Sequence, residues 1–481
     1  MMIDEKMTGY FDDWKDREEA AETMIPLIGT LYRKSGVVTT IYGRSLVHCS
    51  AIDILKAHRF ARQIIKDELS VLSSLPILRA LSQLDLAPAR IDIGKLTTRY
   101  QHNGDGDIAA FVSREVESAQ TDRNALRPEP QDLVLYGFGR IGRMLTRILI
   151  ERGGGGDKWR LRAIVTRSQK GDTLDKRASL LRRDSVHGPF NGTIITDEAE
   201  NALVANGNMI RFLHADAPEE IDYTRYGIEN AIVLDNSGVW RDREGLGRHL
   251  KAPGIAKVVL TAPGLDDIPN IVYGVNDDCI DDDETLVSAC SCTTNAIVPV
   301  LKAMHDRFGI ESGHIETCHS YTNDQNLIDN FHSKHRRGRG APLNMVLTET
   351  GAAEAVNKVL PELRDRLTAN AIRVPTPNVS LAILSLNLRY EPLVAEVNNY
   401  LRDMSLNSPL QGQIDYTSSA EVVSSDFVGN LKTGIVDSLA TIVQGRRCNL
   451  YVWYDNEFGY SIQVTRILQH IARLELPSLP A

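Results

Sequence analysis

At 481 residues the chain is too long for one ordinary core, and its 42% hydrophobic and 24% charged content is that of a globular protein. A net charge of −9 disfavours nucleic acid as the main partner, and no apolar run is long enough to cross a membrane. Six scattered cysteines form no disulfide framework, and the acidic start lacks a signal-peptide core. We therefore expect a cytoplasmic protein of about three domains with no metal site.

Residues 1–129 read as a helical extension. Apolar residues recur at helical spacing in Glu18–Tyr32, Ser50 can cap the next helix, and Ile108–Glu117 is helical again. This region shows no catalytic constellation, so we expect it to pack on the main body or on a neighbouring subunit. The alternative is a regulatory or partner-binding role. The polar segment Ser118–Gln131 is a linker.

A strand, a glycine-rich turn, a helix and a second strand follow. They are Asp132–Tyr136, Gly137-Phe-Gly-Arg-Ile-Gly142, Met144–Ile150 and Leu161–Val165. The three glycines allow, in order, a tight turn, close approach of a pyrophosphate, and close packing of helix on strand. This context predicts a dinucleotide-binding domain, with the pyrophosphate at the helix N-terminus.

The end of the second strand bears on the choice of cofactor. NAD-preferring folds usually place an acid there, against the ribose hydroxyls. Here Thr166, Arg167, Ser168 and Lys170 follow the strand, and these could bind a 2′-phosphate. The alternative is that Arg167 is a solvated surface charge. We expect NADP, or use of both cofactors.

Further strands are expected at Ala231–Asp235, Lys257–Thr261 and Ile271–Val275. Beyond Cys292 the pattern is mixed, with long strands such as Leu381–Tyr390. The sequence thus predicts an α/β Rossmann-type domain followed by an α+β domain with an antiparallel sheet.

Cys292 lies between a strand ending at Ser288 and a helical stretch, Ala296–Met304. A thiol at a helix N-terminus meets unpaired N–H groups and the positive end of the dipole, which favour the thiolate nucleophile. The alternative is that Cys290 and Cys292 are small buried hydrophobes, or half of a metal site.

The second half supplies a base and an anion site. His319 can serve as base or ion-pair partner for a thiolate. Cations in Lys334–Arg339, hydroxyls in Thr348–Ala352 and the arginine of Arg373–Asn378 indicate a phosphate site. The basic run lacks interleaved aromatics, which disfavours a nucleic-acid patch.

From about Asp132 to its end, the chain resembles phosphorylating glyceraldehyde-3-phosphate dehydrogenases; the extension resembles that of a longer, less common branch. The resemblance rests on motifs in family order: Gly137-Phe-Gly-Arg-Ile-Gly-Arg143, Asp184-Ser-Val-His-Gly-Pro-Phe190, Ser291-Cys-Thr-Thr-Asn295, His319-Ser-Tyr-Thr-Asn-Asp-Gln325, Thr350-Gly-Ala-Ala353, Arg373-Val-Pro-Thr-Pro-Asn378 and Trp453-Tyr-Asp-Asn-Glu457. It implies a Rossmann domain over 130–291, completed by a C-terminal helix over 456–481, and a catalytic domain over 292–455. It also implies a cytoplasmic homotetramer acting in glycolysis or gluconeogenesis.

The resemblance also implies roles. Cys292 would attack the aldehyde of glyceraldehyde 3-phosphate, and His319 would act as base. Thr322, Asp324 and Arg373 would bind the substrate phosphate, and Ser291, Arg337, Thr350 and Gly351 would bind inorganic phosphate. Thr293 would contact the substrate or a phosphate. Cofactor contacts would come from Gly137, Phe138, Gly139, Arg140, Ile141, Gly142, Thr166, Arg167, Ser237, Thr261 and Asn456.

Some residues depart from the family pattern. Tyr136 replaces a common asparagine, Cys290 a small residue, and Ala296 a common second cysteine. Asn330-Phe331 stands where NAD-preferring members commonly have leucine–proline, which also puts strict NAD use in doubt. Two rivals remain: a dehydrogenase for another phosphorylated aldehyde such as erythrose 4-phosphate, and a non-catalytic binding protein on the same fold.

Overall fold

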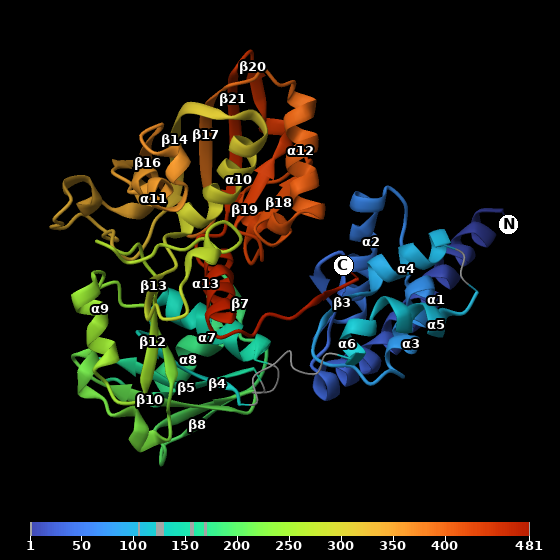
Figure 1. Cartoon of the computed structure of the whole chain (residues 1–481), viewed down its shortest axis with the longest axis horizontal. Helices are drawn as coiled ribbons and strands as arrows, with labels where there is room; N and C mark the ends of the chain where they lie inside the picture. Colours follow the sequence, from blue (N-terminus) through green and yellow to red (C-terminus); the bar gives the residue numbers. More distant parts are fainter. Residues whose placement is uncertain (1, 104–105, 122–128, 154–157, 168–170, 481) are drawn as a thin grey trace. The chain divides into compact units, whose positions relative to one another are not determined.

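The computed structural model describes residues 2–103, 106–121, 129–153, 158–167 and 171–480. They fall into two compact units, one made of residues 1–129 with 473–481 and the other of residues 130–472 (Figure 1). In the described part of the chain, no helix combines the length and apolarity needed to cross a bilayer. Ser168 and Lys170, and residues 122–128 of the predicted linker, lie outside the described residues.

The N-terminal unit is mainly helical, as predicted. Its helices are α1 (Met2–Ser35), α2 (Ala51–Ile65), α3 (Val71–Leu81), α4 (Ile93–Asn103), α5 (Ile108–Glu115) and α6 (Glu117–Thr121). Ser50 caps α2 in a capping box with Asp53, in which each residue's side chain accepts the other's backbone N–H. Met24 and Ile28 of α1 are buried with Ile54 of α2 in one core.

This unit also contains a small sheet that the sequence did not predict. Its order is β2 (Arg44–Ser45), β1 (Val38–Ile41), β3 (Arg90–Asp92) and β22 (Ser478–Leu479). We expected residues 456–481 to complete the nucleotide domain. The final helix, α13 (Phe458–Ile471), does pack against the helix Arg140–Arg152 of that domain. The tail beyond it belongs to the N-terminal unit, where β22 pairs in parallel with β3. Leu479 then packs against the core of the N-terminal unit, and this burial favours the pairing.

The nucleotide domain is built on an eight-stranded sheet. Its order is β13 (Leu286–Ser288), β12 (Ile255–Leu260), β11 (Ala231–Asp235), β4 (Gln131–Tyr136), β5 (Trp159–Thr166), β10 (Asn208–His214), β9 (Ala202–Ala205) and β8 (Ile194–Asp197). The six strands from β13 to β10 are parallel. Its helices are α7 (Arg140–Arg152), α8 (Leu174–Arg182) and α9 (Arg243–Leu250), and a short ribbon joins β6 (Arg183–Asp184) to β7 (Gly188–Pro189).

The prediction of a strand at Ile271–Val275 is wrong. Gly274 has a positive φ of 83°, and the Asn276 side chain accepts the Val272 N–H at 2.8 Å, so the segment turns rather than extends. The Ile271 N–H does bond to the Ser288 carbonyl, but only an isolated bridge at Asn270 results. An apolar run alone does not specify a strand.

The catalytic domain begins with α10 (Cys292–Phe308). Its sheet runs β15 (Val346–Thr348), β16 (Leu367–Val374), β14 (Ile310–Ser320), β17 (Ser380–Leu388), β21 (Arg447–Tyr454), β19 (Gly434–Asp437) and β18 (Ile414–Thr417), with β20 (Ile442–Gln444) beside β21. Helices α11 (Ala352–Val359) and α12 (Val394–Asn407) belong to the same domain. The sheet is mixed rather than purely antiparallel, because β14 pairs in parallel with β16, and β18 with β19.

Candidate active site

Two secondary-structure elements bring Cys292 and His319 together. Cys292 is the first residue of α10, whose N-cap Ser291 accepts the Thr294 N–H at 3.1 Å. His319 is the penultimate residue of β14. The Cys292 Sγ lies 3.5 Å from the His319 Nε2, within hydrogen-bond range for sulfur. The structure thus brings together the two residues that the sequence predicts as nucleophile and base.

Burial sets the protonation of both groups. It raises the pKa of Cys292, against the opposing charge of Arg373, and it lowers the pKa of His319 to about 3. Burial therefore opposes the thiolate that the helix N-terminus favours, and it outweighs the N–H groups of Cys292 and Thr293. Because burial disfavours charge on both groups, the thiol proton must move when the nucleophile is used.

The orientation of the His319 ring is fixed by contacts to its other nitrogen, Nδ1. Its Nδ1 lies 2.7 Å from the Ser320 carbonyl oxygen and 2.8 Å from the Arg373 Nη1, which also donates to that carbonyl at 3.0 Å. When Nδ1–H donates to Ser320, the lone pair of Nε2 is left to accept the thiol proton. Arg373 reaches this position because β14 and β16 pair His319 with Arg373 in register.

The Thr293 side chain, expected to contact a phosphate or the substrate, instead contacts another side chain of the protein. Its hydroxyl lies 2.9 Å from the Tyr454 hydroxyl, which in turn lies 2.7 Å from the Thr317 hydroxyl. Thr293 also lowers the pKa of Cys292 by hydrogen bonds from its side chain and backbone, although burial dominates. The Thr293 side chain therefore supports the thiolate rather than lying open to a phosphate.

Four of the predicted phosphate-site residues form one cluster: Arg337, Asp324, Thr322 and Arg373. Arg337 pairs with Asp324 and donates to the Thr348 hydroxyl at 3.0 Å. Thr322 donates to Asp324, and Arg373 Nη1 lies 3.4 Å from the Thr322 hydroxyl. Burial raises the pKa of Asp324, but Thr322 and Arg337 outweigh it and the net direction is downward. Two guanidinium groups against one carboxylate leave the cluster positive, as an anion site requires.

The other predicted phosphate residues are at helix starts. Gly351 is the N-cap of α11 and supplies no side-chain cap, which leaves N–H groups of the first turn for a ligand. The Thr350 hydroxyl accepts the Ala352 N–H at 3.3 Å. The Ser291 hydroxyl, in addition to capping α10, lies 2.7 Å from the Thr294 hydroxyl.

The glycine loop fits a dinucleotide pyrophosphate. Gly137 has φ of 103°, and a Cβ at Gly142 would lie 2.3 Å from the Gly137 carbonyl oxygen, so side chains are excluded at both positions. Gly139, the N-cap of α7, has open space where a Cβ would be and no side-chain cap. Phe138 is buried, with its ring edge-on to Phe212. The exposed helix start matches an anionic ligand.

Other predicted cofactor residues follow the ends of the parallel strands. The N–H and hydroxyl of Ser237 both donate to Asp235, and the Thr261 hydroxyl donates to the Asp235 carbonyl. The Thr166 hydroxyl lies 3.3 Å from the His214 Nδ1. Arg167 is exposed just beyond β5. These residues occupy the carboxyl edge, where doubly wound sheets bind ligands.

Asn456 is buried, and its Oδ1 accepts a hydrogen bond from the Ser380 hydroxyl at 3.1 Å. Sequence reasoning assigned no role to Ser380 or Tyr454. Their partners, Asn456 for Ser380 and Thr293 and Thr317 for Tyr454, are far away in the sequence. Tyr454 alone carried a signal, because it lies in the motif that contains Asn456. Among the described residues, no group of three or more His, Cys, Asp and Glu side chains could hold a metal ion.

The fold joins a dinucleotide-binding domain to a domain that carries a thiol–imidazole pair and an anion site. Two family profiles match it: "Glyceraldehyde 3-phosphate dehydrogenase, NAD binding domain" over residues 131–243, and "Glyceraldehyde 3-phosphate dehydrogenase, C-terminal domain" over residues 291–456. The chain belongs to the glyceraldehyde-3-phosphate dehydrogenase family.

Relatives fall into two groups by coverage. A "glyceraldehyde-3-phosphate dehydrogenase-like protein" of Pseudomonas aeruginosa (strain UCBPP-PA14) is 58% identical over 460 residues, which are 95% of this chain and 100% of the relative. The glyceraldehyde-3-phosphate dehydrogenases of Borreliella burgdorferi and Priestia megaterium are 38% and 39% identical over 71% and 70% of this chain, and 99% and 97% of theirs. The first alignment is long enough to include most of the N-terminal unit.

Proposed function

We propose that the chain catalyses the reversible oxidative phosphorylation of D-glyceraldehyde 3-phosphate to 1,3-bisphosphoglycerate, with NADP or NAD as cofactor. The observation that carries the proposal is the Cys292–His319 pair, 3.5 Å apart, beside the cationic cluster around Arg373. The named activity of the Borreliella and Priestia relatives supports the same assignment. The reaction would serve glycolysis or gluconeogenesis.

The first half of the reaction forms a thioester. Cys292 Sγ attacks the aldehyde carbon while its proton passes to His319 Nε2, and His319 returns the proton to the aldehyde oxygen, giving a hemithioacetal. His319 then accepts the hemithioacetal hydroxyl proton as the carbon loses a hydride. A bound nicotinamide dinucleotide supplies the hydride acceptor. Arg373 would hold the substrate phosphate together with Thr322.

The second half releases the acyl group. An oxygen of inorganic phosphate attacks the thioester carbon, the carbon–sulfur bond breaks, and Cys292 leaves as a thiolate. Arg337 and the start of α11 at Gly351 would hold that phosphate. The thiolate leaves beside Thr293 and Arg373, both of which favour its charge. The products are an acyl phosphate and the reduced dinucleotide.

Cofactor choice is proposed as NADP, or both cofactors. Arg167 is exposed directly after β5, where a carboxylate would repel a 2′-phosphate, and the Thr166 hydroxyl is adjacent. Arg167→Asp should lower the ratio of kcat/KM for NADP to that for NAD by about tenfold or more, as expected for loss of a charge-assisted contact. An unchanged ratio would remove Arg167 as the 2′-phosphate ligand.

The test of the whole proposal follows the absorbance of reduced nicotinamide with glyceraldehyde 3-phosphate, phosphate and either cofactor. Phosphate-dependent turnover is expected, faster with NADP than with NAD. Turnover only with erythrose 4-phosphate would favour the sister activity, and no turnover with either aldehyde would favour a binding protein. Size-exclusion chromatography with light scattering tests the proposed homotetramer, and cell fractionation the proposed cytoplasmic location.

A further inference from the structure

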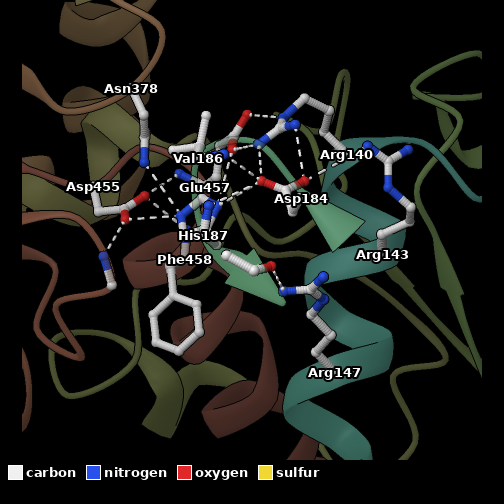
Figure 2. A network of polar contacts seen from close by, with 12 residues as sticks. Arg140, Arg143, Arg147, Asp184, Val186, His187, Asn378, Asp455, Glu457 and Phe458 are labelled. Carbon is white, nitrogen blue, oxygen red and sulfur yellow. Dashed lines mark hydrogen bonds and ion pairs between the residues drawn. The ribbon is translucent and has the colours of Figure 1, made fainter. Parts of the chain in front are cut away.

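A network of charged side chains connects the glycine loop to the segment that holds Asn456 (Figure 2). Arg140, in the glycine loop, pairs with Glu457 and donates from Nη1 to Asp184 Oδ2 at 3.0 Å. Glu457 directly follows Asn456. One guanidinium group therefore connects the loop that fits the pyrophosphate with the segment of Asn456, which the family resemblance implies is a cofactor contact.

His187, between β6 and β7, lies at the centre of this network. Its Nε2 is 3.1 Å from Asp455 Oδ2, and its Nδ1 is 3.5 Å from Asp184 Oδ1 and 3.6 Å from Glu457 Oε2. The side chain is only 5% exposed, and its ring stacks on Phe458 with centroids 5.9 Å apart. Carboxylates thus lie near both nitrogens of one buried imidazole.

Only the doubly protonated ring can donate toward both sides. A ring with its proton on Nε2 keeps the bond to Asp455 but presents a lone pair on Nδ1 to Asp184 and Glu457. The other tautomer would place a lone pair against Asp455, with Asn378 Nδ2, 3.2 Å away, as its donor. Either neutral form brings a nitrogen lone pair close to a buried carboxylate, which is unfavourable.

The surrounding charges favour the imidazolium. The charged groups around His187 are Asp184 of β6, Asp455 and Glu457 between β21 and α13, and Arg140, Arg143 and Arg147 of α7. Burial lowers the pKa of His187, but the hydrogen bond to Asp455 and the three carboxylates outweigh it, and the net direction is upward. The arginines are held by other partners: Arg140 by Glu457 and Asp184, and Arg147 by the Gly188 carbonyl.

Asp455 connects the protonation of His187 to the position of the segment that holds Asn456. Its Oδ1 caps α13 by accepting the N–H groups of Glu457 and Phe458 at 2.9 and 2.8 Å. Its Oδ2 accepts the Gly429 N–H at 2.8 Å in addition to contacting His187. Asn456 lies between two residues that both contact the imidazole, so a change at His187 acts on both sides of it.

We propose that His187 is a positioning residue for the dinucleotide: its protonated form holds the Asn456 segment against the glycine loop, and dinucleotide affinity falls when His187 loses its proton. The inference rests on the proposed role of Asn456. His187 touches neither substrate nor the reacting atoms in this scheme, and it acts through Asp455 and Glu457.

The test measures binding of NAD and NADP to the full-length chain by titration calorimetry between about pH 6 and pH 9, across the range in which a histidine titrates. For the wild type, Kd should rise by about tenfold as pH increases through the range, as for one pK unit of linkage. His187→Gln should bind with the weaker, high-pH affinity throughout and show no such rise. His314→Gln, which removes an exposed histidine 3.5 Å from Glu316, is the matched control and should follow the wild type.

Kinetics separate positioning from catalysis. His187→Gln should raise KM for the dinucleotide and leave the pH profile of kcat as in the wild type. A Kd profile of His187→Gln parallel to that of the wild type would overturn the proposal. If that variant does not fold, Glu457→Gln decides: removing one carboxylate should move the midpoint of the Kd profile to lower pH, and an unmoved midpoint would overturn the proposal. Because Kd requires no turnover, a failed aldehyde assay would reject the proposed function without touching this result.

Discussion

The N-terminal unit and the unit of residues 130–472 treat buried ionisable groups differently. In the first, Asp92 accepts the Thr40 hydroxyl and the N–H groups of Gly43 and Lys95, which fastens a hairpin and the start of α4. Its buried His58 contacts the Ile54 carbonyl through Nδ1, while Nε2 is buried without a hydrogen-bond partner. In the second, the partly buried Cys292 and the buried His319 are paired with one another in the candidate active site.

The difference separates a structural use of polar groups from a chemical one. A carboxylate such as Asp92, whose oxygens are taken up by nearby donors, stabilises its fold and has little capacity for another ligand. A partly buried thiol within hydrogen-bond distance of a buried imidazole can pass its proton to that imidazole, and perturbed pKa values at such paired groups cluster at functional sites. The predictions below test whether this division between the units holds.

The largest effect is expected at Cys292. Cys292→Ser should reduce turnover by about 10⁴-fold or more, because a serine hydroxyl is a far weaker nucleophile beside the same base. Thermal unfolding and dinucleotide Kd should not change. Cys279→Ser, the same replacement at an exposed cysteine, should retain full turnover. Surviving turnover in Cys292→Ser would show that the nucleophile lies elsewhere.

In the N-terminal unit the large effects should be on stability. Met24 is fully buried in α1, so Met24→Ala should lower the unfolding free energy by about 2–5 kcal/mol, with a matching loss of hydrogen-exchange protection in α1 and α3. Phe11 lies on the same helix but is 62% exposed, and Phe11→Ala should cost less than about 0.5 kcal/mol. Equal losses for the two variants would contradict the packing described for α1.

The two units should respond to pH in opposite directions. Burial lowers the pKa of His58 from 6.5 to about 4, so the unfolded chain binds this proton first as pH falls. The stability difference between wild type and His58→Gln should therefore shift against the wild type between pH 6.5 and pH 4, by on the order of 2 kcal/mol.

The pKa of His187 is raised instead, so its contribution is fully present below the ordinary pKa and is lost as pH rises through the raised value. The unfolding free energy of the wild type should therefore exceed that of His187→Gln by the largest amount at low pH. Denaturant titrations of both pairs of proteins at several pH values provide the check. If the stability difference between wild type and variant changed with pH in the same direction for both histidines, the contrast would be wrong.

The smallest effects concern two helix caps. Ser50→Ala and Ser291→Ala each remove a side-chain acceptor from a helix N-terminus, and each should cost about 1 kcal/mol of stability. Only Ser291→Ala should also lower kcat/KM, because its helix begins at Cys292. A comparable loss of kcat/KM in Ser50→Ala would assign the N-terminal unit a part in catalysis.

Local features of this protein were predictable from its sequence. The cap at Ser50, the glycine loop and the start of α10 beside Cys292 depend on contacts within a few residues, so the order of residues along the chain is sufficient to specify them. The same holds for β11, whose predicted bounds match the structure, because a buried parallel strand is a short continuous apolar run.

What the tertiary structure decided depends on partners far apart in the chain. The tail became β22 because β3 and an apolar core were available to it, whereas the more apolar segment Ile271–Val275 turned. Arg373 reached His319 through the β14–β16 register, and His187 met Asp455 through folding of one domain on the other. Burial, set by the whole fold, raises the pKa of Cys292 where the helix dipole alone would lower it.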